Sequence, residues 1–383
     1  MMLQGGEVWI SRWTPVTVAL VHIVVLGVLG NAMLGALTQF LPVAAGSPFP
    51  SRVAALAHVL LNAGVIVFVP AMTWLSRPAM CVAGALLVAS LVIFALSVLV
   101  AVVRGRGPRW LRGGIGVSLG ALVMTASLGA VALLTLAGLV SARLDWLVDV
   151  HAAGGLVGWV LMLIVVVGAV TMPMLQGSRA PAPGAVQTWV ALVLMGLLVG
   201  AWRRSEESND VLVWTSALAS WLFAGASTWL QWRARHRRNP VLVAFWTVGT
   251  IALALAATVL VAPALPRFDR AMLVGTLSIG IGLLLIVVGM MLEIFSFLAW
   301  IWLRRMVPRG RQIPGVGRLL PDGDKRFVLA AHLIAAVALL AALLAQRGHA
   351  EAGGLWSLAW LGTLVVLLRC WGRANAELPR TET

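Results

Sequence analysis

Residues 146–175 read WLVDVHAAGGLVGWVLMLIVVVGAVTMPML, a run that is apolar almost throughout. A helix needs about 20 predominantly apolar residues to cross the hydrocarbon core of a bilayer, so this run is long enough to span a membrane. It also carries one imidazole, His151, inside the apolar part, where an ionisable side chain is costly. The stretch therefore predicts a membrane-spanning helix that bears a polar site.

The rest of the chain has the same character. Of its 383 residues, 61% are hydrophobic and 11% are charged, and the mean hydropathy is +0.98. Soluble domains carry about 45–50% apolar and about 25% charged residues. The composition therefore excludes a soluble or disordered protein, and two cysteines exclude a disulfide scaffold. We expect one integral membrane domain over residues 1–383.

Apolar runs bounded by charge, proline or glycine predict an all-α, polytopic membrane helix bundle with eleven spans. A twelfth is expected only if one long run hides a re-entrant piece. The longest hydrophilic stretch, 303–325, is predicted to be a basic cytoplasmic loop. The predicted spans are 14–41, 52–76, 79–103, 113–140, 146–175, 184–202, 210–232, 240–263, 271–302, 326–346 and 353–371.

The net charge of +15 would suggest nucleic acid in a soluble protein, but here the arginines lie at span ends and in loops. No basic face is interleaved with aromatic residues, so we expect no nucleic-acid partner; the expected surroundings are the lipid bilayer. With eleven spans, eight of the 28 Lys and Arg residues lie on the side of the N-terminus. Because basic residues favour the cytoplasm, the N-terminus is predicted to lie outside and the C-terminus inside.

Each ionisable side chain inside an apolar run is a candidate functional residue. The candidates are His22, His58, His151, Glu293 and His332, whereas His236 and His349 are expected in solvated loops. Counted along their spans, His22 and His151 fall in the outer half of the bilayer, and His58 and His332 fall in the inner half. The four histidines thus form two layers of two.

Two imidazoles at one depth on different spans are suited to hold a haem iron from both faces, and imidazole also suits copper. Glycines after His22 and His151 would give a macrocycle room, although small residues also serve ordinary helix packing. Cofactor binding is therefore expected at His22, His151, His58 and His332, with His22, His151 and His58 as metal ligands. The alternative is that each imidazole bonds a neighbouring side chain or backbone carbonyl.

Two further polar residues belong to this set. Asn62 lies four residues after His58, hence on the same helical face, where it either lines the same site or orients the imidazole. Glu293 is expected to be protonated, paired with an arginine of the inner loops, part of a proton path, or directed to the membrane interface.

Four stretches occur in an order that resembles a known family: HIVVLGVLGNAMLGALTQFLPVAAGSPFP, AHVLLNAG, VHAAGGLVGWVLMLIVVVGAVTMPMLQGS and GMMLEIFSFLAWIWLRR. Together they are similar to the NnrS-type haem- and copper-containing membrane proteins, bacterial multispan proteins distantly related to haem–copper oxidase subunit I. The resemblance implies a bacterial inner-membrane location, histidine-bound haem or copper, and a link to respiration or nitric-oxide stress. It extends to His22, His58 and His151; His332 rests on its depth alone.

The chain departs from the oxidases in two ways. They use a tandem histidine pair for copper and a tyrosine beside the binuclear centre, but this sequence has no adjacent histidines and no tyrosine. We therefore do not expect oxygen reduction by the standard mechanism. Glu293 and Trp302 stand where the resemblance implies a more basic residue and a histidine, which argues against a site on the ninth span.

Three functions are compatible with these features. The first is a haem- or copper-binding protein for redox transfer, sensing or metal handling. The second is a cofactor-free transporter of a small solute or metal, and the third is a structural or assembly subunit that binds respiratory-chain proteins. The sequence does not decide whether the protein is an enzyme.

Overall fold

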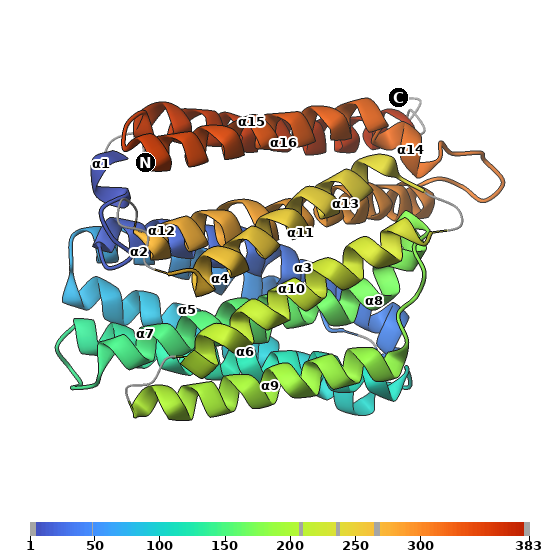
Figure 1. Ribbon diagram of the computed structural model, residues 1–383. Helices are drawn as coiled ribbons and strands as arrows, with labels where there is room; N and C mark the ends of the chain where they lie inside the picture. The colour runs from blue at the N-terminus through green and yellow to red at the C-terminus, as the bar shows by residue number, and fades with distance from the viewer. Residues whose placement is uncertain (1–4, 48, 207–209, 235–237, 264–268, 379–383) are drawn as a thin grey trace.

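The computed structural model describes residues 5–47, 49–206, 210–234, 238–263 and 269–378. Within them it is all-α, with no strand and with eleven helices long and apolar enough to cross a membrane. The helices run side by side, and the chain termini lie at opposite ends of the bundle (Figure 1). The predicted fold class and the count of eleven spans are therefore confirmed.

Three spans are longer than the others and are interrupted by π-helical winding. The first is α2 (Pro15–His22), η1 (Ile23–Gly30), α3 (Asn31–Phe40) and η2 (Leu41–Ala45). The fifth is α7 (Leu144–Ala153), η3 (Gly154–Leu161) and α8 (Met162–Gln176). The ninth is α12 (Arg270–Gly275), η4 (Thr276–Leu283) and α13 (Leu284–Met306).

The other eight spans are continuous α-helices, and two short helices, α1 (Gly5–Val8) and α14 (Val316–Leu319), lie outside the spans. Several start on proline at the first turn, where its missing N–H costs nothing. The eight are α4 (Ser51–Thr73), α5 (Arg77–Arg104), α6 (Arg109–Leu136), α9 (Pro183–Ser205), α10 (Asp210–Trp232), α11 (Pro240–Val261), α15 (Asp322–Ala345) and α16 (His349–Ala376).

The long spans recur at every fourth position along the chain, as spans one, five and nine. The fifth and ninth are the most enclosed of all the spans. A π-helical stretch widens the helix and is frequent at functional sites. The stretches η1, η3 and η4, one in each long span, therefore mark the interior of the bundle as the place to look for a site.

The predicted loop 303–325 is wrong at both of its ends. Helix α13 continues to Met306, α15 already begins at Asp322, and α14 forms a turn of helix between them. A helix can continue beyond the hydrocarbon at charged residues such as Arg304 and Asp322. Its backbone groups are hydrogen-bonded within the helix, and the charged side chains reach water.

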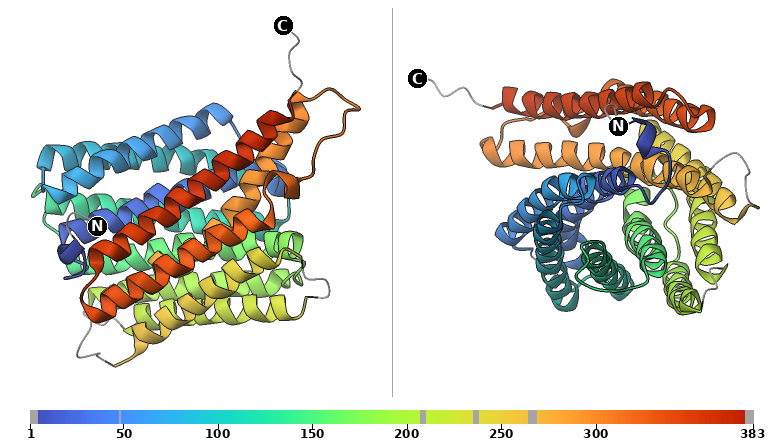
Figure 2. Two further views of the ribbon diagram at one scale, coloured as in Figure 1. Left: turned by 90° about the horizontal axis from the view of Figure 1, so that it is seen from above. Right: turned by 90° about the vertical axis from the view of Figure 1, so that its left-hand side faces the viewer.

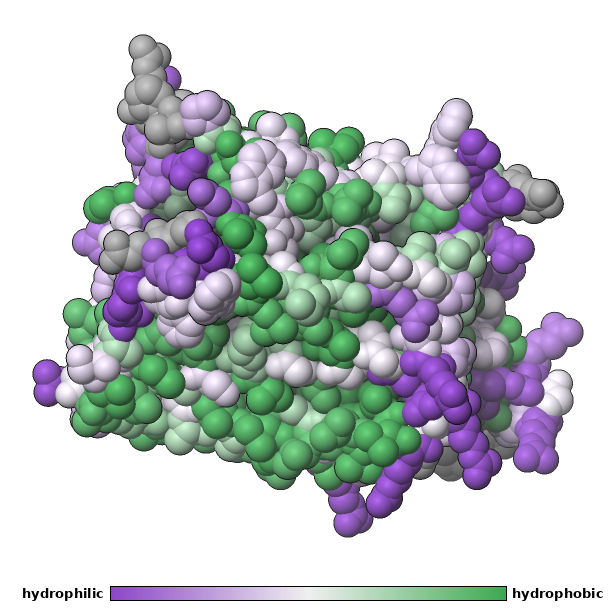
Figure 3. Space-filling view, turned by 60° about the horizontal axis from the view of Figure 1, so that its bottom comes forward, coloured by the Kyte–Doolittle hydropathy of each residue, from purple (hydrophilic) through white to green (hydrophobic). Residues whose placement is uncertain are grey.

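The surface agrees with a membrane setting. Figure 3 shows a broad hydrophobic band between hydrophilic residues at the two ends of the bundle. Large apolar side chains on the outside of the spans, such as Ile66, Leu192 and Val337, are well exposed. Contiguous exposed apolar surface of this extent is typical of contact with lipid, so the chain is a multi-pass membrane protein.

The last two helices pack against each other on one face of the bundle, beside α13 (Figure 2). The remaining spans curve away from them. The end of the bundle that holds α1 and the starts of α2, α7 and α12 is called the N-terminal end below (Figure 1).

Candidate cofactor-binding site

His22 and His151 come together inside the bundle. Their ring centres lie 6.0 Å apart and their planes are inclined by 22°. His22 is the last residue of α2, directly before η1, and His151 lies near the end of α7, three residues before η3. Two long spans thus place their imidazoles at the same point, immediately beside their π-helical stretches.

Backbone carbonyls fix the same tautomer in both rings. His22 Nδ1 lies 2.8 Å from the carbonyl oxygen of Val18, and His151 Nδ1 lies 2.9 Å from that of Thr125. A carbonyl oxygen can only accept, so each Nδ1 carries the proton and donates. The lone pair is therefore on Nε2 of both rings, which is the form that a metal ion binds, with the orienting hydrogen bond that metal-bound histidines have.

Glycine makes room for the second ring. A Cβ at Gly129, on α6, would lie 2.8 Å from Cε1 of His151, closer than carbon atoms approach each other. On the other side, the ring of Phe68 packs 4.7 Å from that of His22. The two imidazoles are thus held by packing as well as by hydrogen bonds.

The pair opens into a cavity of about 880 Å³. Its lining is largely apolar and includes residues of η1, η3 and η4, for example Val24, Val157 and Ile279. Cofactor sites are mostly apolar cavities of about 300–1,000 Å³ with a few placed polar groups. Thr125 also lines the cavity, and its buried Oγ1 has no hydrogen-bond partner among the described residues.

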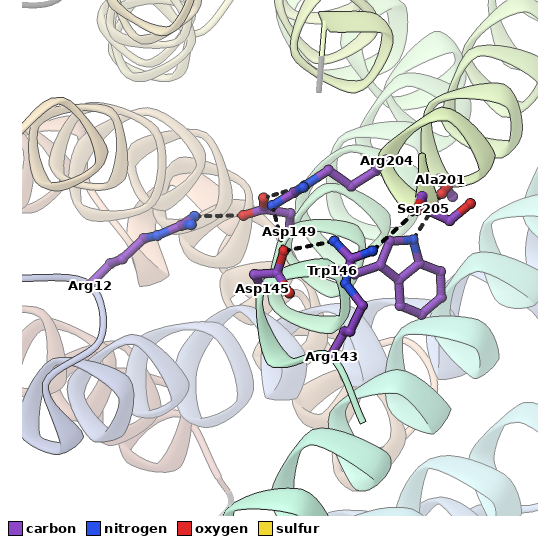
Figure 4. A network of polar contacts seen from close by, with 8 residues as sticks. All are labelled: Arg12, Arg143, Asp145, Trp146, Asp149, Ala201, Arg204 and Ser205. Atoms are coloured by element: carbon purple, nitrogen blue, oxygen red, sulfur yellow. Dashed lines mark hydrogen bonds and ion pairs between the residues drawn. The ribbon is translucent and has the colours of Figure 1, made fainter. Parts of the chain in front are cut away.

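A network of ion pairs lies at the N-terminal end of the bundle (Figure 4). Asp149, two residues before His151, accepts from Arg12 Nη1 at 2.8 Å and from Arg204 Nε at 3.0 Å. Arg204 also binds Asp145 at 3.1 Å. Arg12 and Asp149 both line the cavity, so the network joins the segment before α2 to α7 and α9 at the cavity wall.

This network was not predicted from the sequence, because charges at span ends are expected from membrane topology alone. The available signal was the position of Asp149 inside the run 146–175, two residues from His151. Its side chain is 9% exposed, which shows that it faces the protein and not the interface.

His58 forms a separate polar cluster with two asparagines. His58 Nδ1 donates to Asn31 Oδ1 at 3.0 Å, and the side chains of Asn31 and Asn62 bond each other in both directions. Asn62 also donates to the backbone carbonyl of His58. The residue that orients His58 is therefore Asn31, whose amide Asn62 holds in place, and His58 Nε2 keeps a lone pair.

His332 is buried and bonded elsewhere. Its Nε2 lies 2.9 Å from Thr363 Oγ1, and Thr363 donates to the carbonyl of Ala359, so His332 Nε2 carries the proton. The edge of its ring packs against Trp360. Within the described residues no ring contact joins His332 to His58, so the structure gives the two histidines of the inner layer separate partners.

Glu293 forms a buried ion pair with the only lysine of the chain. Lys325 Nζ lies 2.6 Å from Glu293 Oε1, and both side chains are 10% exposed or less. Of the roles expected for Glu293, pairing with a cation is the one observed, but the cation is a lysine on α15 and not an arginine of a loop. Neither residue lines the cavity that holds His22 and His151.

Two histidines were expected in solvated loops. His349 instead begins α16 and stacks on Trp9 with ring centres 5.5 Å apart. His236 lies outside the described residues. Among those residues, no group of three or more His, Cys, Asp or Glu side chains is placed to hold a metal ion, so the ligands that do converge are the imidazoles of His22 and His151.

Comparison with known proteins adds no relative: no family model matches the chain, and neither a curated protein nor a solved structure does.

Proposed function

We propose that this protein binds a haem between His22 and His151 and acts as a membrane redox protein, either in electron transfer or in sensing. One observation carries the proposal: two imidazoles from different spans lie with ring centres 6.0 Å apart, and each ring donates from Nδ1 to a backbone carbonyl and keeps the lone pair of Nε2. His22 and His151 are therefore the residues that would hold the haem iron.

The surroundings support a large, mostly apolar ligand. The cavity of about 880 Å³ provides the space, and Gly129 and Gly155 on its wall carry no side chain that would fill it. A haem with two imidazole ligands supplies one-electron redox chemistry. The part of this chain is then to hold both rings, to orient them through Val18 and Thr125, and to exclude water.

The resemblance noted in the sequence extends this proposal to its biological setting: a bacterial inner membrane, with a role in respiration or in the response to nitric oxide. Copper is the second metal that the resemblance implies. Of the four candidate histidines, His58 is the other one whose Nε2 keeps a lone pair to bind it, since His332 donates from Nε2. By the distribution of basic residues we also propose that the N-terminal end of the bundle faces outwards.

The test is the haem content of the purified protein, measured by absorption spectrum and pyridine haemochrome, together with its copper content. We expect a Soret band in the wild type and its loss in His22→Ala and in His151→Ala. His332→Ala is the control, because this histidine also packs against an aromatic ring, but neither it nor that ring lines the cavity. A colourless wild-type protein, expressed with haem in excess, would contradict the proposal.

A cofactor-free transporter is the second candidate function. It is favoured by one observation, the departure of three cavity-lining spans from regular α-helical winding, since irregular helices line the substrate sites of transporters. Uptake into vesicles by a protein without haem would support it.

A further inference from the structure

The polar cluster around His58 lies at the middle of two spans, on the outside of the bundle. Asn62 is the middle residue of α4, with eleven residues of the helix on either side. Its side chain is exposed, between Val59 and Ile66 on the same helical face, which are 65% and 71% exposed. Its partner Asn31 lies next to the midpoint of the first span. The cluster therefore meets lipid near the centre of the bilayer, where polar side chains are costly and mark functional sites.

Every side-chain donor of the two asparagines is used within the protein. Asn31 Nδ2 donates to the carbonyl oxygen of Gly27 at 2.9 Å and to Asn62 Oδ1 at 3.1 Å. Asn62 Nδ2 donates to Asn31 Oδ1 at 3.0 Å and to the carbonyl oxygen of His58 at 2.8 Å. Each amide nitrogen thus bonds a backbone carbonyl, which can only accept, so the orientation of both amides is fixed.

The groups that remain free in the cluster accept hydrogen bonds. His58 donates from Nδ1 to Asn31 Oδ1, so its Nε2 carries a lone pair. This atom has no partner among the described residues, it keeps accessible surface, and His58 does not line the central cavity. Asn62 Oδ1 accepts one bond, from Asn31, although an amide oxygen has two lone pairs. The cluster thus offers two acceptors and no donor.

Two acceptors without a donor select a molecule that brings a proton to share. A second copy of the chain, placed symmetrically, would bring the same two acceptors and could not pair with them. A helix of another protein is disfavoured, because membrane helices approach each other at small residues, whereas the bulky Val59 and Ile66 flank Asn62. The occupant that fits is a small lipid-soluble molecule with a hydroxyl group.

Depth narrows the class of this molecule. The hydroxyls of ordinary lipids belong to their headgroups, about 15 Å from the centre of a hydrocarbon core that is about 30 Å thick. A hydroquinone with an apolar tail can enter the core with its ring, and its phenolic O–H is a stronger donor than an aliphatic one.

We propose that this cluster binds a lipid-soluble hydroquinone, whose phenolic hydroxyl donates to His58 Nε2 beside the second acceptor, Asn62 Oδ1. Asn31 is a positioning residue, since it fixes the tautomer of His58. The inference does not require a haem between His22 and His151. It does exclude copper at His58 while the hydroxyl is bound, because both would use the same lone pair.

The site should distinguish the reduced from the oxidised form of its ligand. A quinone carries carbonyl oxygens in place of the two hydroxyls, so it has no proton to donate. Sites built to bond a hydroxyl reject analogues that lack it, because the polar groups of the site are then left unpaired.

The experiment measures the displacement of tritiated decylhydroquinone from the full chain in lipid nanodiscs, under argon. The competitors are unlabelled decylhydroquinone, its quinone, its dimethyl ether and dodecanol. We expect the hydroquinone to displace the label at least about tenfold better than the other three. The quinone and the ether lack the donated proton, and the alcohol is the weaker donor.

Variants then locate the binding. His58→Phe keeps a ring and removes the acceptor, so it should lower the affinity at least about tenfold, and Asn62→Leu should lower it as well. His332→Phe is the matched control, because it replaces another histidine of a span, but one whose Nε2 donates to Thr363. Thermal unfolding of each variant is compared with that of the wild type, so that a folding defect is seen directly.

The comparison of competitors on the wild type needs no variant, so the inference stays testable if His58→Phe does not fold. Preference for the hydroquinone in the wild type, lost in His58→Phe and kept in His332→Phe, supports it, whatever the haem content. It is overturned if the hydroquinone does not bind, if the quinone, the ether or dodecanol competes equally well, or if the two phenylalanine variants behave alike. Disulfide cross-linking of Asn62→Cys to another membrane protein, without hydroquinone binding, would assign the cluster to a partner helix instead.

Discussion

The imidazoles of His22 and His151 meet in the centre of the bundle, 6.0 Å apart, although the first lies on the first span and the second on the fifth. Each donates from Nδ1 to a backbone carbonyl. Because both rings are already oriented in the protein without a metal, binding a metal between them would cost little conformational entropy.

Gly129→Ala is expected to weaken haem binding by about 10- to 100-fold, because the new methyl group would displace the ring of His151. The measurement is the haem affinity of the purified variant. Gly120→Ala on the same helix is the control, since nothing lies within 4 Å of a Cβ there. Equal haem binding by the two variants would show that the position of His151 does not matter.

Asp149→Asn is expected to lower the free energy of unfolding by about 1–3 kcal/mol, because Arg12 and Arg204 lose the carboxylate that both of them bind. Thermal unfolding in detergent checks this. Glu206→Gln removes a carboxylate from an exposed pair with Arg203 and is expected to cost at most about 1 kcal/mol. A variant of Asp149 no less stable than that of Glu206 would show that the network does not hold the spans together.

The buried pair of Glu293 and Lys325 is expected to behave as a structural unit. Lys325→Gln should destabilise the protein by about 3–5 kcal/mol, because it leaves the buried carboxylate of Glu293 unpaired. Glu293→Gln should destabilise it less, since Asp322 Oδ1 stays 3.9 Å from Lys325 Nζ. The double variant Glu293→Met/Lys325→Met should recover most of this stability, because an apolar pair of similar volume needs no partner. Haem content should stay unchanged in the double variant, as neither residue lines the cavity.

If instead the double variant retains full stability but loses uptake of a solute in vesicles, Glu293 acts in transport and the structural account of this pair is wrong.

The orientation in the membrane is tested with single cysteines. After Cys81 and Cys370 are replaced by alanine, Ser141→Cys and Arg309→Cys place one thiol in an exposed loop at each end of the bundle. We expect a membrane-impermeant maleimide to label residue 141 in intact cells, and residue 309 only after the membrane is opened. The opposite pattern would reverse the proposed topology.

The spans were predictable from the sequence because lipid imposes a simple length requirement on apolar runs. The run 146–175 corresponds to the span Leu144–Gln176, for example. The segment 303–325 was predicted less well, since helices can continue past the hydrocarbon and hydropathy does not mark where they end. The π-helical stretches could not be predicted, because a run that is apolar on every side has no hydrophobic periodicity that would distinguish π-helical from α-helical winding.

The candidate site was predictable only in part. Position along a span gives the depth of a histidine but not the direction in which its ring points. By depth alone, the pair of His22 and His151 is equivalent to the pair of His58 and His332. Of these two pairs, only His22 and His151 have their rings in contact among the described residues. Depth likewise did not reveal that Asn31 would orient His58, or that Lys325 would reach Glu293 from a neighbouring helix.

The most direct test of the central claim is electron paramagnetic resonance of the oxidised, haem-loaded protein, because it reports the two axial ligands of the iron. The account predicts a low-spin ferric signal of the kind given by two imidazoles, converted to a high-spin signal or lost with the haem in His22→Ala and in His151→Ala. A low-spin signal that survives unchanged in both variants would show that any haem is held elsewhere and that these two histidines are not its ligands.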